Sequence, residues 1–231
     1  MKPLIIIPAR GGSKGIPHKN IKPLCGKPLI YYTIDCARKL VSDEDICVST
    51  DDAEIIKCVE EYGLSVPFIR PQELATDTSG SHEVLVHALN FYKRIGKEYD
   101  CIVLLQVTSP FRKDVHVKEA LSLYQPALDM VVSVRDSATN PYYNCFQEGN
   151  DGFLHRVLDN SGYTRRQDAP ITYEYNGSIY VINPDSLLKK SMGKFARVKK
   201  YIMDEIYSLD IDTPLDLHFA EFVIREHLVE L

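Results

Sequence analysis

A glycine-rich loop near the start of the sequence carries three cationic side chains at short intervals. The loop follows the apolar residues 4–7, which predict a buried strand, and it contains Arg10, Lys14 and Lys19. Glycine permits close approach of the backbone to a ligand, and successive backbone N–H groups in such a loop form a concave site for anions. A basic glycine loop directly after a first strand therefore predicts binding of a phosphate chain. The alternative is an exposed connecting loop, and neither GxxxxGK[ST] nor GxGxxG fits it.

Two carboxylates near the end of the sequence form a second candidate group. Asp210 and Asp212 are two positions apart in the stretch IYSLDIDT, residues 206–213, and in a strand both would point to one face. Mg²⁺ usually takes one or two carboxylates together with the phosphates of a substrate. The alternative is structural, because Thr213 begins a predicted helix with Asp216 at the capping-box position, and Asp212 would then belong to that helix start.

Other polar residues lie where predicted strands end or predicted helices begin. Gln106 follows an apolar run, and ligands in open α/β sheets collect at the carboxyl ends of strands, although a simple turn is the alternative. Ser79 and Ser81 precede a predicted helix, where hydroxyl groups either cap the helix or bind ribose and phosphate oxygens. Arg165 and Arg166 form a cationic pair of a kind that is usually solvated at a surface.

Alternating strands and helices must position these groups. Short apolar runs alternate with longer amphipathic runs, which is the pattern of βαβ units and a parallel sheet. Asp51 and Asp52 precede the second helix and are interpreted as helix caps rather than metal ligands. The predicted strands are residues 4–7, 46–49, 66–69, 100–105, 130–134, 175–182 and 206–213, and the predicted helices are residues 29–40, 53–62, 83–94, 115–124 and 215–228, with a short helix after Asn183.

Residues 136–170 break this pattern. Asp, Asn, Ser and Gly become frequent there, aromatic residues stand between them, and no helical period persists. We predict a single domain over residues 1–231 with a β-rich excursion inserted at residues 136–170. Exposed aromatic side chains on such an excursion indicate a surface for a partner chain.

Composition limits the class of function. The chain has 231 residues and a formal net charge of −5, which argues against nucleic acid as a partner. We expect no signal peptide and no membrane span, and therefore a cytoplasmic protein, because no apolar run approaches the roughly 20 residues that cross a bilayer. The six cysteines include no CxxC pair, so we expect free thiols rather than a zinc site.

Several segments together resemble one enzyme family. The string PARGGSKGIPHKN of residues 8–20 resembles the N-terminal signature of the acylneuraminate cytidylyltransferases, the CMP-sialic acid synthetases. The related CMP-Kdo synthetases have a different loop. Further similar segments follow in the family's order, and the resemblance covers nearly the whole chain. They are RPQELATDT at residues 70–78, LLQVTSPFR at 104–112, RRQD at 165–168, NGSIYVI at 176–182 and SLDIDT at 208–213.

The resemblance implies a fold and a reaction. The fold would be a Rossmann-like, mostly parallel sheet flanked by helices, of the nucleotide-diphospho-sugar transferase type, in a homodimer that exchanges residues 136–170. The reaction would join CMP from CTP to the anomeric 2-hydroxyl of a nine-carbon 3-deoxy-2-keto sugar acid, an N-acylneuraminate or Kdn, and release pyrophosphate. Legionaminate or Kdo as the sugar acid, or a non-catalytic nucleotide-binding module, are the alternatives.

The resemblance also implies roles for individual residues. Catalytic roles fall to Arg10, Lys19, Arg166 and Asp212, and Asp210 and Asp212 would hold Mg²⁺. The sugar acid would contact Gln106, Arg166 and Tyr180. The implied nucleotide contacts are Arg10, Gly12, Ser13, Lys14, Lys19, Asn20, Arg70, Ser79 and Ser81.

Overall fold

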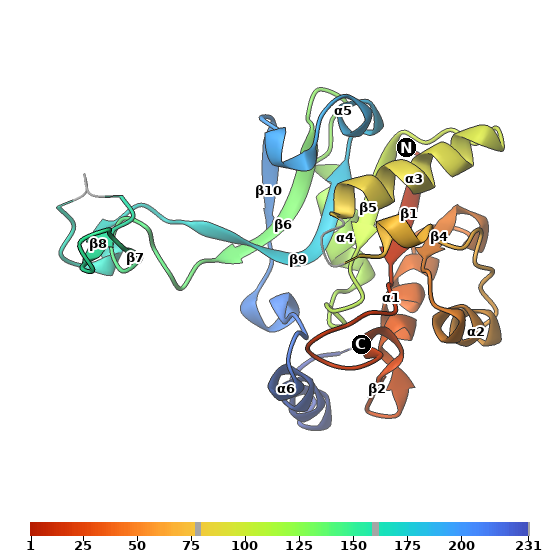
Figure 1. Ribbon diagram of the computed structural model, residues 1–231, viewed down its shortest axis with the longest axis horizontal. Helices are drawn as coiled ribbons and strands as arrows, with labels where there is room; N and C mark the ends of the chain where they lie inside the picture. Colours follow the sequence, from red (N-terminus) through yellow and green to blue (C-terminus); the bar gives the residue numbers. More distant parts are fainter. Residues whose placement is uncertain (77–79, 159–161, 231) are drawn as a thin grey trace.

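The computed structural model describes residues 1–76, 80–158 and 162–230. Within these residues a central sheet of six strands has the order β10-β6-β9-β5-β1-β4 (Figure 1). Strand β1 lies parallel to β4 and β5, and β6 lies parallel to β10, whereas β9 runs antiparallel to β5 and β6. The predicted α/β fold with a mostly parallel sheet is therefore confirmed. The strands are β1 (Pro3–Pro8), β4 (Ile46–Ser49), β5 (Cys101–Leu105), β6 (Met130–Asp136), β9 (Tyr173–Ile182) and β10 (Val198–Ile202).

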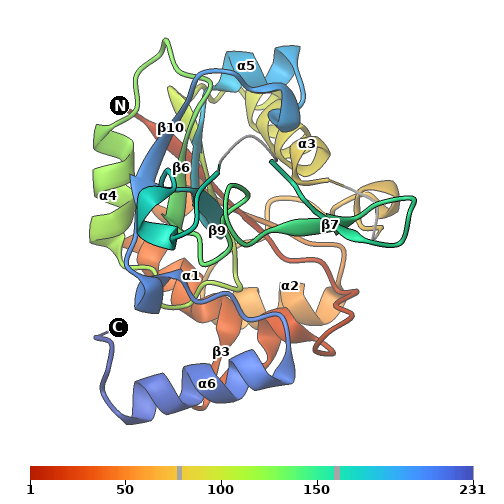
Figure 2. The same ribbon diagram turned by 90° about the vertical axis from the view of Figure 1, so that its left-hand side faces the viewer.

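Helices cover both faces of the sheet because its inner strands are apolar on both sides. Ile5 and Ile7 of β1 belong to one hydrophobic core, with side chains of α1, α2, α4 and α6. Leu4 and Ile6 belong to the other core, with side chains of α3 and α5. Figure 2 shows α3 and α5 near one another beside the sheet. All four side chains are fully buried, and each burial stabilises the fold by roughly 1.5–3 kcal/mol. The helices are α1 (Leu29–Arg38), α2 (Ala53–Glu61), α3 (Ser81–Arg94), α4 (Asp114–Ser122), α5 (Pro184–Lys189) and α6 (Pro214–Arg225).

The predicted elements and the observed ones differ in several places. Residues 66–69 do not form a strand, and a single bridge joins Thr50 to Ile69. Pro67 lies within this run and has no N–H to donate to a ladder. Residues 206–213 are also not a strand, because Glu205–Ser208 form a 3₁₀ helix and the following residues form no ladder. The edge strand β10 was not predicted.

Residues 136–170 leave the sheet between β6 and β9. They carry a hairpin of two short strands, β7 (Phe146–Glu148) and β8 (Leu154–Arg156), which extends far from the rest of the chain (Figure 1). Phe153 and Leu154 at its tip are 70% and 71% exposed. The excursion therefore has few contacts with the domain from which it extends, and it presents large apolar side chains to the solvent.

The remaining features are small. A second hairpin, β2 (Pro23–Leu24) with β3 (Lys27–Pro28), follows the glycine-rich loop. In the described part of the chain, no helix is long and apolar enough to cross a membrane. The cysteines are free thiols, as expected.

Candidate active site

The glycine-rich loop after β1 forms one wall of a cavity of about 450 Å³. The other walls come from the segment before α3, the start of α3, the loop after β5 and the residues before α6. Gly12 lies in the same loop, and a Cβ there would meet nothing within 4 Å. Ser79 lies outside the described residues. Of the predicted nucleotide contacts, Arg10, Ser13, Lys14, Lys19, Asn20, Arg70 and Ser81 line the cavity.

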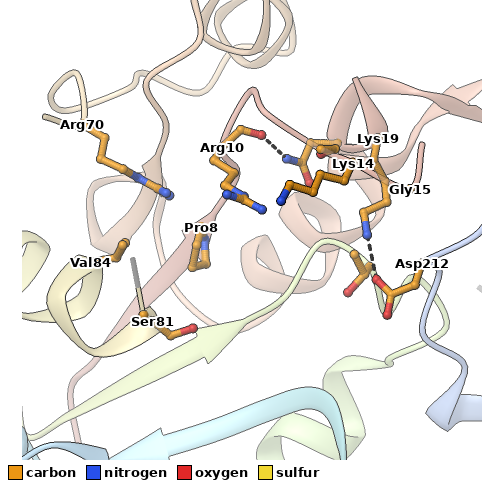
Figure 3. A pocket seen from close by; sticks show the side chains of 13 residues that line it. Pro8, Arg10, Lys14, Gly15, Lys19, Arg70, Ser81, Val84 and Asp212 are labelled. Carbon is orange, nitrogen blue, oxygen red and sulfur yellow. Dashed lines mark hydrogen bonds and ion pairs between the residues drawn. The ribbon is translucent and has the colours of Figure 1, made fainter. Parts of the chain in front are cut away.

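Positive charge is concentrated in this cavity. Figure 3 shows the side chains of Arg10, Lys14 and Arg70 directed toward the same space. Arg70 is only 4% exposed, and its Nε donates to Ser49 Oγ at 3.1 Å. Burial lowers the pKa of the Arg70 guanidinium, the direction expected for a cation that has lost part of its hydration. An anion that enters the cavity would therefore exchange water for fixed positive charge.

At two positions of the loop, the backbone lies so close to a neighbouring residue that only glycine fits. A Cβ at Gly15 would lie 2.2 Å from the carbonyl oxygen of Asp212, and a Cβ at Gly11 would lie 2.3 Å from Asp52 Oδ2. The Gly11 N–H donates to Asp51 Oδ1 at 3.2 Å. Asp52 caps α2, as predicted, by accepting hydrogen bonds from two backbone N–H groups of its first turn. Asp51 instead holds the glycine-rich loop, a role for which the sequence offered no signal.

The two candidate metal ligands flank a buried anchor. Ile211 is fully buried, and its N–H donates to the Thr108 carbonyl at 2.9 Å, which ties the acids to the loop after β5. Asp210 Oδ1 is buried and has no hydrogen-bond partner among the described residues. Burial raises the pKa of Asp210; the nearby Thr108 hydroxyl opposes this rise, and the negative charge of Asp212 adds to it.

Asp212 faces the glycine-rich loop. Lys19 Nζ lies 2.9 Å from Asp212 Oδ1, which joins the first and last candidate groups of the sequence across 193 positions (Figure 3). The capping box of α6 is made by Thr213 and Asp216, and Asp212 contributes only its backbone N–H to Asp216 Oδ2, at 3.1 Å. The carboxylate of Asp212 therefore does not cap α6.

The proposed sugar contacts are only partly brought together. Gln106 follows β5, and its side chain lies against Tyr180 of β9, whose hydroxyl pKa is raised by burial. Neither residue lines the first cavity. Arg166 does not line the first cavity. It lies at the base of the excursion in a second cavity of about 490 Å³, together with Arg135 and Glu174, which form an ion pair.

Comparison with known proteins places this site in a family. A family model described as cytidylyltransferase matches residues 4–228. The chain belongs to the cytidylyltransferase family. An N-acylneuraminate cytidylyltransferase of Streptococcus agalactiae serotype III (strain NEM316) is 39% identical over 98% of this chain and 55% of the relative. The chain thus spans about half the length of that relative.

Another relative matches over nearly its whole length. A CMP-N,N'-diacetyllegionaminic acid synthase of Legionella pneumophila subsp. pneumophila (strain Philadelphia 1 / ATCC 33152 / DSM 7513) is 34% identical, over 100% of this chain and 97% of the relative. Among solved structures, a CMP:2-keto-3-deoxy-manno-octonic acid synthetase complexed with CTP superposes with a TM-score of 0.72. That match covers 98% of this chain and 99% of the solved chain at 20% identity. It therefore supports the fold of this protein and not its substrate.

Proposed function

We propose that this cytidylyltransferase joins CMP from CTP to the anomeric hydroxyl of a nine-carbon 3-deoxy-2-keto sugar acid. The observation that carries the proposal is the cavity in which the cations of the glycine-rich loop and Arg70 share the lining with Asp212, the second acid of the pair before α6. A triphosphate needs such cations, and a carboxylate pair is what a phosphate-bound Mg²⁺ needs from the protein. The N-acylneuraminate cytidylyltransferase and the legionaminic acid synthase among the relatives support the substrate class.

The reaction begins with a severe electrostatic problem. Both substrates are anions, and two unit charges about 4 Å apart repel by roughly 4 kcal/mol at an effective dielectric constant of 20. Arg10, Lys14 and Lys19 would offset this repulsion at the phosphates of CTP. Because Lys19 also contacts Asp212, its ammonium group is already held in position before a substrate arrives.

The chemical step is an in-line displacement. The anomeric oxygen of the sugar acid forms a bond to the α-phosphorus of CTP, and the bond from that phosphorus to the α–β bridging oxygen breaks. Pyrophosphate leaves, and the proton of the anomeric hydroxyl goes to solvent or to a base. Arg10 and Lys19 would stabilise the charge that grows on the leaving pyrophosphate, while Gln106 and Tyr180 would orient the sugar acid.

Asp210 and Asp212 fit an Mg²⁺ that substrate phosphates help to hold. The buried Asp210 Oδ1 makes no hydrogen bond of ordinary geometry among the described residues, although the Thr108 hydroxyl is near the carboxyl group, so this oxygen is available to a ligand. The described residues contain no group of three or more His, Cys, Asp or Glu side chains placed to hold a metal alone. When bound, the ion would neutralise charge on the α-phosphate and polarise it.

Arg166 fits the proposal only if it acts in another copy of the chain. We propose that the protein is a homodimer whose residues 136–170 reach the partner's cavity, where Arg166 would form a two-pronged bond to the carboxylate of the sugar acid. The extended excursion with its exposed apolar tip supports this arrangement. Mixing Arg166→Ala and Asp212→Ala proteins, each inactive alone, should restore part of the activity if the dimers exchange subunits.

Pyrophosphate release tests the proposed reaction. The protein would be incubated with CTP and Mg²⁺ and, in parallel, with N-acetylneuraminate, Kdn, N,N'-diacetyllegionaminate or Kdo, with Asp212→Ala as the control. Turnover of a nine-carbon acid that is lost in the variant supports the proposal and identifies the substituent at C5. Binding of CTP without turnover of any acid would instead support a non-catalytic nucleotide-binding module.

A further inference from the structure

Strand β9 contains a bulge beside the candidate active site. The register between β6 and β9 shifts between Val132 and Val134, so that Ser133 lies opposite residues 176–179 of β9. Bulges redirect the chain and are frequent next to active sites. Within the bulge, Gly177 has φ +71°, in the left-handed region that favours glycine.

Buried hydrogen bonds of the Asn176 side chain fix the conformation of the bulge. Ser133 Oγ donates to Asn176 Oδ1 at 2.6 Å, and Asn176 Nδ2 donates to Ser208 Oγ at 2.9 Å. Asn176 is only 4% exposed. It therefore joins β6, β9 and the 3₁₀ helix that leads to Asp210, and it fixes the position of Gly177 relative to that acid.

Arg112 fixes the other side of the bulge. Its guanidinium is buried and donates to the Ser178 carbonyl at 2.9 Å and to the Gln106 carbonyl at 3.1 Å. It also donates to Thr33 Oγ1 at 3.0 Å. The Arg112 guanidinium thus connects Ser178, the residue after Gly177, with Gln106, which is predicted to contact the sugar acid. Its bond to Thr33 anchors this arrangement to α1.

Gly177 lies between two polar groups of the candidate site. A Cβ at this position would be 3.5 Å from Asp210 Oδ2 and 3.9 Å from Gln106 Nε2. These are ordinary contact distances, so a methyl group would clash with no atom of the protein, although the positive φ would strain any side chain at this position. It would, however, occupy the space between an amide and an acid whose Oδ1 has no partner among the described residues.

We propose that Gly177 is a specificity-determining residue that leaves room between Asp210 and Gln106 for the anomeric end of the sugar acid. Asn176 and Arg112 are positioning residues, because they act through Gly177 and Gln106 rather than on the substrate. The inference rests on the proposed function, since it assigns this space to the acceptor of the cytidylyl group. It predicts that a side chain at position 177 weakens binding of the acceptor much more than binding of CTP.

The test compares Gly177→Ala with Gly96→Ala. Gly96 has φ +77° and no atom within 4 Å of a Cβ, so this control introduces the same backbone strain away from the site. Gly177→Asn is the second variant, since Asn adopts the left-handed region more readily than other side chains and fills the same space. The Michaelis constants for CTP and for the turned-over sugar acid are measured for each folded variant.

The expected result is selective. Both Gly177 variants should raise KM for the sugar acid by about 10-fold or more and change KM for CTP by less than about 3-fold, which is the scale of a methyl group excluded from a pocket. Gly96→Ala should leave both constants unchanged. Equal effects on both substrates, or no effect in a folded variant, would overturn the inference. A wild-type protein that turns over no sugar acid would refute the proposed function before any variant is compared.

Discussion

Replacement of Gly15 by alanine tests whether the glycine-rich loop and the acidic pair form one site. The new methyl carbon would stand 2.2 Å from the carbonyl oxygen of Asp212. That atom belongs to the backbone, and the preceding residue, Ile211, is buried and hydrogen-bonded to Thr108, so the Asp212 carbonyl has little freedom to move away. The loop and the acid must therefore separate.

The distance by which the loop and the acid separate determines the expected loss of catalytic rate. An ordinary carbon–oxygen contact needs roughly 1 Å more than the available distance, and a misplacement of about 1 Å at a reacting centre costs on the order of 100-fold in rate. This corresponds to about 2.7 kcal/mol of transition-state stabilisation. Overpacking should also lower the free energy of unfolding by about 1–3 kcal/mol. The ion pair of Lys19 with Asp212 would be stretched at the same time.

The assay is pyrophosphate release under conditions in which the variant is fully folded, with thermal unfolding measured in parallel. Gly193→Ala is the control, because a Cβ there meets nothing within 4 Å and the residue lies outside the site. We expect kcat/KM to fall about 100-fold in Gly15→Ala and to be unchanged in Gly193→Ala. A folded Gly15→Ala protein with kcat/KM within about 3-fold of wild type would refute the reasoning.

Three further predictions concern charge and packing. Lys19→Met should lower kcat/KM by about 100-fold or more in the pyrophosphate assay. Its melting temperature should hardly change, because the partner carboxylate of Asp212 is 69% exposed, and a large fall in melting temperature would contradict this. Hydrogen bonds, foremost from the Arg197 N–H, hold the pKa of Asp129 well below its usual range, so its stabilising effect is present at neutral pH and lost as the pH falls below about 4. Asp129→Asn should therefore melt several degrees lower than wild type at pH 7, with a difference that narrows in acid, and a constant difference would count against this role. Phe111→Ala should lower the free energy of unfolding by about 3–5 kcal/mol in urea titrations, because Phe111 is fully buried, and a loss below about 1 kcal/mol would show that the site collapses.

The fold was predictable where apolar runs were buried on both faces. The runs at residues 4–7, 46–49, 100–105 and 130–134 all form strands, because a parallel sheet covered by helices requires such continuous apolar segments. Strand β10 was missed because it lies at the sheet edge and carries Lys199 and Lys200, charges that protect an edge but hide the strand pattern.

The candidate site was predictable in its residue types but not in its arrangement. The glycine-rich loop and the acids before α6 contain the charged groups that phosphate and metal chemistry need, and these can be read from the sequence. The contact of Lys19 with Asp212 depends on the fold, since 193 positions separate the two residues. The hydrogen bond from Gly11 to Asp51 and the links made by Arg112 likewise depend on which loops meet at the sheet edge.

Phosphorus NMR of the reaction mixture tests the central claim most directly, because it identifies which phosphorus of CTP is attacked. With CTP, Mg²⁺ and the sugar acid, the proposed reaction predicts that the three signals of CTP are replaced by one phosphodiester signal and pyrophosphate. Formation of CDP with orthophosphate would place the attack at the γ-phosphorus, and it would contradict the assignment of this site as a cytidylyl-transfer centre.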